Sequence, residues 1–118
     1  MDRAALQSLV GVLQKQVPML VRRAPPTGDS LEGVLSGQDL PRCCEVLTAA
    51  LGPPVKDFGK TANLEGALQW AVKGIGGIRT EQCLYLKEGE QQQIVYAVLW
   101  PWASDSSRVT LKVGIAGQ

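Results

Sequence analysis

The segment IRTEQCLYLKEGEQQQIVYAVLWPWASDSSRVTLKVGI, residues 78–115, decides the fold that we expect. Three apolar runs lie within it, at residues 78–86, 94–100 and 109–115, and turn-forming residues separate them. Runs of this kind predict β-strands, and strands that follow one another through short connections predict an antiparallel meander. A sheet of this size needs a cover on one face, and the residues before Gly76 are expected to provide it as helices.

The second and third strands of the expected meander differ in how they face solvent. Residues 94–100 are apolar at every position, which is typical of a central strand covered on both faces. Residues 109–115 alternate apolar and polar side chains, as a half-exposed strand does. As the last strand it is expected at an edge of the sheet, where Arg108 and Lys112 oppose pairing with another chain.

An amphipathic helix is expected near the N-terminus. Asp2 is a suitable cap, and Pro18 ends or kinks the helix because proline lacks a backbone donor. Residues 19–21 favour a further helical turn because Leu20 continues the apolar stripe, with a short edge strand beside the meander as the alternative. The stripe consists of apolar residues at helical spacing: Leu6, Leu9, Val10, Leu13 and Val17.

A loop and a short helical turn are expected next. Two prolines and a glycine within residues 24–30 prevent both helix formation and strand pairing there. Residues 31–35 are expected to form one helical turn, with Ser30 as its cap.

Two longer helices complete the expected cover. The first begins at Asp39 and ends at Gly52, where a left-handed residue is favourable. The second begins at Thr61 or Asn63 and ends at Gly74. The first is expected to bury the side chains of Cys43, Val46, Leu47, Ala50 and Leu51.

The expected fold is therefore α+β, with about three N-terminal helices (residues 1–75) packed on one face of a three-stranded antiparallel β-meander (residues 76–118). A chain of 118 residues is typical of a single domain, here residues 1–118. Helices on one face leave the other face of the apolar central strand uncovered. This predicts a homodimer that pairs through that face or through an edge strand.

Composition excludes several classes of partner and chemistry. The net charge is +1, with 12 basic and 11 acidic residues, so no charge excess favours nucleic acid or an anionic membrane. No apolar run is long enough to span a membrane, and the first residues lack a signal-peptide pattern. Histidine is absent, which removes the commonest general base and metal ligand. Three cysteines, an odd number, favour a reducing, cytoplasmic setting.

Little in the sequence indicates catalysis. Residues 59–61 (GKT) match the end of a phosphate-binding loop, but Pro54 occupies the position where that motif requires glycine. Cys43 and Cys44 are adjacent and lack the spacing of zinc or thioredoxin-like motifs. A helix N-terminus would lower the pKa of Cys44, which leaves a reactive thiol open. We expect no cofactor, no metal and no assignable catalytic residue.

The segment Trp100-Pro101-Trp102 is the strongest binding candidate, because tryptophan is enriched in interface hot spots. A tryptophan at a strand end also closes the rim of a core. We favour this rim interpretation for Trp100, whereas both interpretations stay open for Trp102. Trp70, on the third expected helix, is the remaining candidate, and a surface shared by Trp70 and Trp102 would be the expected patch.

These features favour a non-catalytic, self-associating module that binds a protein partner or a small apolar ligand through the sheet face and the tryptophan loop. The alternative is a small enzyme with carboxylate or cysteine chemistry in a pocket between helices and sheet. We prefer the module because no catalytic constellation is visible. An enzyme would show a carboxylate or a Cys44 thiol of shifted pKa at the base of a pocket.

Overall fold

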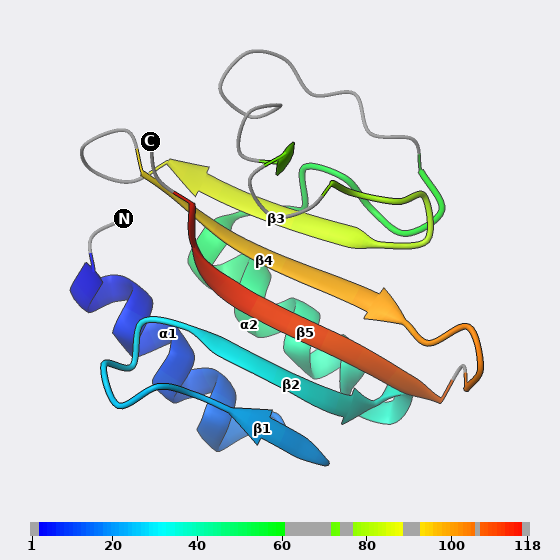
Figure 1. Ribbon diagram of the computed structural model, residues 1–118, viewed down its shortest axis with the longest axis horizontal. Helices are drawn as coiled ribbons and strands as arrows, with labels where there is room; N and C mark the ends of the chain where they lie inside the picture. The colour runs from blue at the N-terminus through cyan, green and yellow to red at the C-terminus, as the bar shows by residue number, and fades with distance from the viewer. Residues whose placement is uncertain (1–2, 61–71, 74–76, 89–92, 106, 117–118) are drawn as a thin grey trace.

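An antiparallel sheet with helices on one face makes up the described part of the chain (Figure 1). The computed structural model describes residues 3–60, 72–73, 77–88, 93–105 and 107–116. The helices are α1 (Arg3–Gln16) and α2 (Leu40–Leu51), and the short 3-10 turn η1 (Gly37–Asp39) directly precedes α2. The strands are β1 (Val21–Arg23), β2 (Leu31–Ser36), β3 (Cys83–Glu88), β4 (Ile94–Pro101) and β5 (Arg108–Ala116). The expected α+β class is confirmed.

Four long strands form the sheet in the order β2-β5-β4-β3, and the three-residue β1 adds to the edge beside β2. Every neighbouring pair is antiparallel. The strands β3, β4 and β5 follow one another as the predicted meander, with Ala97 opposite both Tyr85 and Val113. The Cα radius of gyration, 13.3 Å, is that of a compact chain of this length.

The helical turn predicted at residues 31–35 is wrong, because these residues form β2. Leu31 and Leu35 are buried and Glu32 between them is exposed, which is the two-residue period of a strand. Each residue of β2 pairs with β5, from Leu31 opposite Val113 to Ser36 opposite Arg108. The spacing of apolar residues in this short segment fits a helical turn and a strand equally well, so pairing with β5 decides.

Two predictions about the sheet edges also need correction. Residues 21–23 pair with β2, so the edge-strand alternative replaces the helical turn, and Leu20 is 60% exposed. The last strand, β5, is not an edge, because β2 supplies a neighbour that the sequence did not predict. The sheet edges are β1 and β3, and Lys56 forms an isolated antiparallel bridge with Leu84 at the outer side of β3.

The end of α1 and both ends of α2 agree with the sequence, whereas the expected cap of α1, Asp2, lies outside the described residues. The helix α1 stops at Gln16, two residues before Pro18. The helix α2 follows Asp39 and ends at Gly52, which has a positive φ of 82°. Asp39 occupies the cap position without a side-chain hydrogen bond to the helix. Within the described ranges, no helix has the length and apolar character needed to cross a bilayer.

The third predicted helix falls mostly outside the described residues. Residues 61–71 and 74–76 belong to that part, and Trp70 with them. Val72 and Lys73 are described and helical, and Val72 packs against the sheet.

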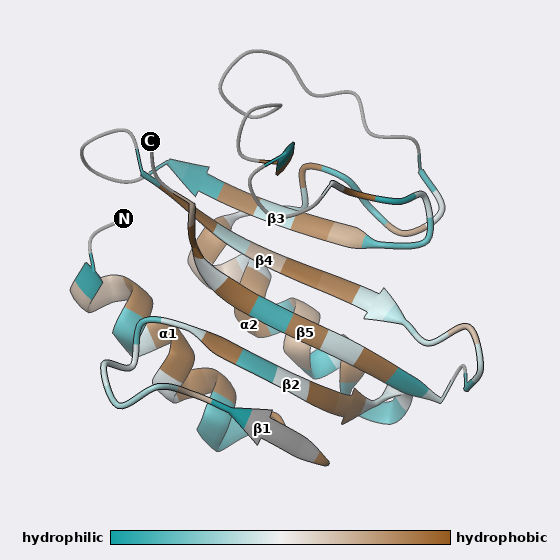
Figure 2. Cartoon of the chain, viewed as in Figure 1, coloured by the Kyte–Doolittle hydropathy of each residue, from teal (hydrophilic) through white to brown (hydrophobic). Residues whose placement is uncertain are grey.

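Apolar side chains cover both faces of the sheet. On the helix side, Val95, Ala97 and Leu99 of β4 join residues of α1 and α2 in the main core. On the opposite side lies a second cluster: Leu84, Leu86, Ile94, Tyr96, Val98 and Ala116, with Val72, Ile78 and Trp100 packed against it. Figure 2 shows β4 predominantly apolar along its length, whereas β5 alternates. The prediction that β4 is covered on both faces is confirmed.

Candidate functional site

Trp100 and Trp102 lie close together at the end of β4 and are held in different ways. Trp100 is half-buried at the rim of the second cluster and lies opposite Thr110. Nε1 of Trp102 donates a hydrogen bond of 2.7 Å to Oγ1 of Thr110. The guanidinium carbon of Arg108 lies 5.6 Å from the centre of the Trp102 ring. A hydrogen bond and a cation–π contact therefore hold Trp102 against β5.

A groove of about 470 Å³ borders both tryptophans. Its lining combines aromatic, small and polar residues: Trp100, Pro101, Trp102, Ala103, Ser104, Arg79, Glu81 and Gln82. The structure thus brings Trp100 and Trp102 to one surface, and their binding role stays a prediction. The patch that Trp70 and Trp102 were expected to share lies outside the described residues.

The three cysteines are free thiols near the contact between α2 and β3. Burial raises the pKa of Cys43 and of Cys83 to about 12. Burial also raises the pKa of Cys44, despite a hydrogen bond with Tyr85 that acts in the opposite direction. The predicted lowering of the Cys44 pKa by the helix N-terminus is therefore wrong, because desolvation disfavours the thiolate more strongly. At neutral pH these thiols are protonated and weakly nucleophilic.

Two described carboxylates, those of Asp105 and Asp57, accept hydrogen bonds from neighbouring residues of their own loops. Oδ1 of Asp105 accepts hydrogen bonds from the hydroxyl (2.6 Å) and the amide (3.1 Å) of Ser107, and these bonds lower the pKa of Asp105. Oδ1 of Asp57 accepts a 2.8 Å bond from the amide of Phe58. Within the described ranges, no three Cys, Asp or Glu side chains are grouped so that they could hold a metal ion.

An apolar groove of about 730 Å³ runs between α1 and α2 on their solvent side. Exposed helix positions usually carry long polar side chains, but most of this lining is small or apolar. The lining residues are Ala5, Ser8, Leu9, Val12, Val46, Ala49 and Ala50, with Gln16, Arg42 and Glu45 as the polar members. Val12 is 37% exposed within it. The sequence did not predict this groove. Val46 and Ala50 were expected to be buried, but they are only partly buried and line it.

Polar side chains at one end of this groove connect the two helices. Arg42 of α2 donates a hydrogen bond to Oε1 of Gln16 in α1. The same guanidinium forms an ion pair of 3.1 Å with Glu45, one turn further along α2. Both charged side chains are more than half exposed, so they line the groove at its solvent-facing rim.

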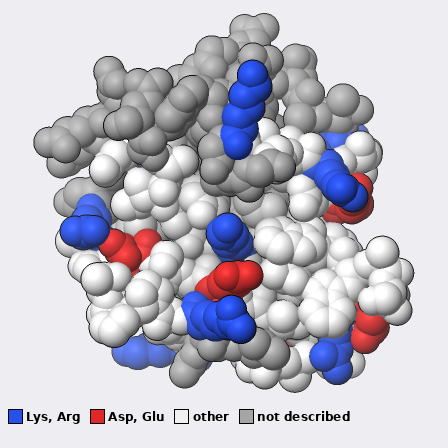
Figure 3. All heavy atoms as spheres, viewed as in Figure 1, with Lys and Arg blue, Asp and Glu red and all other residues white. Residues whose placement is uncertain are grey.

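A polar pocket of about 620 Å³ lies on the other side of the molecule, over β1, β2, β5 and β4. Arg23 is opposite Glu32, and Glu32 is opposite Lys112, so three charged residues form a row across the sheet. Figure 3 views this face, and basic, acidic and basic groups follow one another from its centre toward β1. Tyr96 and Ser30 add hydroxyl groups, and Ala24 and Pro25 are apolar members of the lining. Leu31 and Val113 also border the pocket, but their side chains belong to the main core on the helix side.

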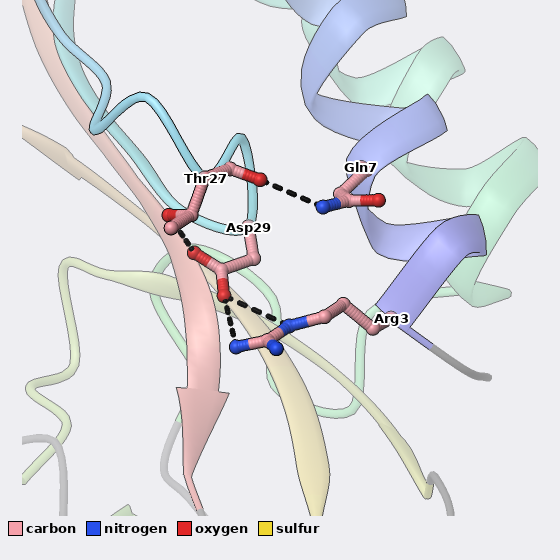
Figure 4. Close-up of polar contacts among 4 residues, drawn as sticks. All are labelled: Arg3, Gln7, Thr27 and Asp29. Atoms are coloured by element: carbon pink, nitrogen blue, oxygen red, sulfur yellow. Dashed lines mark hydrogen bonds and ion pairs between the residues drawn. The ribbon is translucent and has the colours of Figure 1, made fainter.

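The loop that forms one wall of this pocket is fixed to α1 (Figure 4). Arg3 pairs with Oδ2 of Asp29 at 2.7 Å, and Nε2 of Gln7 donates a 2.7 Å bond to the carbonyl of Thr27. The hydroxyl of Thr27 donates a 2.7 Å bond to Oδ1 of Asp29. The Thr27 bond and then Arg3 lower the pKa of Asp29, so its charge is kept. This network holds the loop in one position beside the sheet.

Comparisons of this chain with protein-family models, with curated proteins and with solved structures returned no match. The fold class is α+β, and the surfaces described above are the basis for inferring function.

Proposed function

We propose that this chain is a non-catalytic, self-associating binding module, and that two copies meet through the groove between α1 and α2. The observation that supports this is the apolar lining of the groove on the solvent side of the helices, with Val12 exposed. Monomeric proteins rarely expose large contiguous apolar patches, and such patches mark interaction sites.

The sheet exposes less apolar surface for dimerisation than the sequence predicts. Ile94, Tyr96 and Val98 are buried on the face opposite the helices. Val72 and Ile78 of the same chain pack against that cluster. The apolar surface available to a second copy therefore lies on the helices, and the proposed interface moves there from the sheet.

The exposed side of α1 is suited to packing against itself. When two such helices cross antiparallel about a two-fold axis between Ser8 and Leu9, Val12 of each copy lies opposite Ala5 of the other. A large side chain then faces a small one on both sides of the axis, as ridges-into-grooves packing requires. Such an interface is isologous, which is the usual arrangement of dimers. Arg42 and Glu45 on the rim provide both signs of charge.

Charge substitution in the groove tests this proposal. Val12→Glu places a carboxylate in the interface and is expected to weaken dimerisation at least about 100-fold, because a buried unpaired charge is costly. Val55→Glu is the matched control, because Val55 is 38% exposed and lies outside the groove. Sedimentation velocity over a dilution series measures both, with circular dichroism as a check on folding.

Two results would contradict the proposal. One is equal weakening by both substitutions. The other is a wild-type chain that stays monomeric at high micromolar concentration, which would leave the groove to a helix of another protein.

Trp100 and Trp102 are retained in the proposal as residues that contact a protein partner or a small apolar ligand. The supporting observation is that their groove lies at the end of β4, away from the helix surface. Trp102→Ala is expected to reduce affinity for such a ligand while the dimer persists.

A further inference from the structure

We infer that the polar pocket over β1, β2, β5 and β4 binds a small monocarboxylate with an apolar body, through Tyr96, Lys112 and Arg23. Its volume of about 620 Å³ falls in the range of small-molecule sites. A small number of placed polar groups fix the orientation of a ligand in such sites. This surface lies on the face of the sheet opposite the proposed dimer interface, so the two proposals can fail separately.

Tyr96 lines this pocket, and no hydrogen bond joins its hydroxyl to another residue of the described ranges. Tyr96 is only 8% exposed, and its hydroxyl forms no hydrogen bond with any described residue. No side-chain oxygen or nitrogen of the described part is both hidden from solvent and without a hydrogen bond. Tyr96 is one of the residues that line the pocket, and the carboxylate of Glu32 in the same lining is close enough to act on its hydroxyl.

The ring of Tyr96 is held in place by the strand beside it. Gly114 is its register partner in β5, and a Cβ atom at Gly114 would lie 2.8 Å from the Tyr96 hydroxyl. The ring therefore lies over a glycine that leaves room for it. The hydroxyl is a pre-oriented donor, which lowers the entropic cost of binding a ligand.

Charge decides the class of ligand. Arg23 and Lys112 are basic and Glu32 is acidic, so the row has a net charge of +1 (two minus one). The ion pairs of the described residues involve other side chains: Arg3–Asp29, Arg42–Glu45 and Arg108–Asp105. Both basic groups of the row therefore have donors available, and one negative charge balances the site. A phosphate dianion would leave an excess of negative charge beside Glu32.

The hydroxyl keeps its proton at neutral pH. Burial, and then the carboxylate of Glu32, raise the pKa of Tyr96 above its usual value. A protonated phenol can donate to a carboxylate oxygen while Lys112 supplies charge. Ala24 and Pro25, which line the pocket, would contact the body of the ligand.

Benzoate is the probe ligand. Benzamide is the comparison compound without a charge, and phenyl phosphate is the comparison compound with two negative charges. Binding is measured by chemical-shift titration of the 15N-labelled chain. Benzoate is expected to bind more tightly than either comparison compound. Tyr96→Phe keeps the ring and removes only the hydroxyl, and should weaken benzoate about tenfold, as loss of a hydrogen bond to a charged group does. Tyr85→Phe is the matched control, because Tyr85 is buried on the helix side of the sheet.

Charge variants give a second, independent readout. Lys112→Gln should weaken benzoate binding about tenfold, and Glu32→Gln should strengthen it, since the net charge of the row rises. The inference is overturned if benzoate shows no saturable binding. It is also overturned if benzamide or phenyl phosphate binds at least as well, or if Tyr96→Phe and Tyr85→Phe have equal effects.

Discussion

Replacing Lys56 by methionine is expected to destabilise the fold, because this lysine is buried and its ammonium group binds two backbone carbonyls. Its side chain is 3% exposed, and Nζ donates to the carbonyl oxygens of Thr80 and Gln82. Its amide donates to the carbonyl of Leu84 at 3.3 Å and its carbonyl accepts from Leu84 at 2.8 Å. Lys56 thus joins the segment after α2 to the beginning of β3.

The size of the loss in the free energy of unfolding follows from the two carbonyls that methionine leaves without a donor. A hydrogen bond to a charged group contributes about 1.5–3 kcal/mol, and a buried carbonyl without a donor costs about 1–3 kcal/mol. Methionine fills the volume of the lysine stem and avoids burying an ammonium group, which offsets part of this loss. We expect the free energy of unfolding to fall by about 2–4 kcal/mol.

Urea unfolding followed by tryptophan fluorescence measures this loss. With a slope typical of small proteins, the midpoint should fall by about 1–2 M urea. Lys60→Met is the matched control, because Lys60 is exposed in the same loop. It should change the free energy of unfolding by less than about 0.5 kcal/mol. If both variants unfolded at the same urea concentration, the Lys56 ammonium would contribute nothing, and the reasoning would be refuted.

Three further predictions concern packing, pH and the tryptophan loop. Gly114→Ala should cost about 1–2 kcal/mol in urea unfolding, because its Cβ would force the Tyr96 ring to shift; an unchanged midpoint would contradict this. Burial raises the pKa of two buried thiols from 9.0 to about 12, so the unfolded chain loses these protons first. The contribution of these two thiols to stability should therefore be constant below pH 9 and should fall between pH 9 and pH 12 under reducing conditions, as thermal melts across that range would show. Trp102→Phe removes the donor to the Thr110 hydroxyl and should cost about 1 kcal/mol in urea unfolding. A loss no larger than that of Lys60→Met would argue against a contribution from this bond.

Local sequence signals predicted the parts of the fold that local chemistry determines. The meander follows from three apolar runs with turn residues between them. The limits of α2 follow from Asp39 and Gly52, which suit its two ends for stereochemical reasons. The strand β2 could not be predicted in this way, because its five-residue apolar pattern has no preferred period. Its partner, β5, lies far away in the sequence, so only tertiary pairing selects the strand.

The surfaces were harder to predict than the fold. Trp100 and Trp102 could be predicted as binding candidates because tryptophan is enriched in interface hot spots. The groove between α1 and α2 is built from alanine, serine and valine, which have no chemical signature of their own. The polar pocket combines Arg23, Glu32, Lys112 and Tyr96, and these residues meet only after β1, β2, β5 and β4 assemble. Neither surface has a spacing that sequence reasoning could recognise.

The pairing of β2 with β5 has a consequence for synthesis of the chain. Leu31 lies opposite Val113, and these residues are 82 positions apart (113 minus 31). At about 5–20 residues per second, a ribosome needs roughly 4–16 s to add the intervening residues. During that interval β2, with its apolar residues Leu31 and Leu35, lacks the strand that pairs with it in the folded chain. Chaperones that recognise such segments would therefore be expected to act on this chain before its last strand is complete.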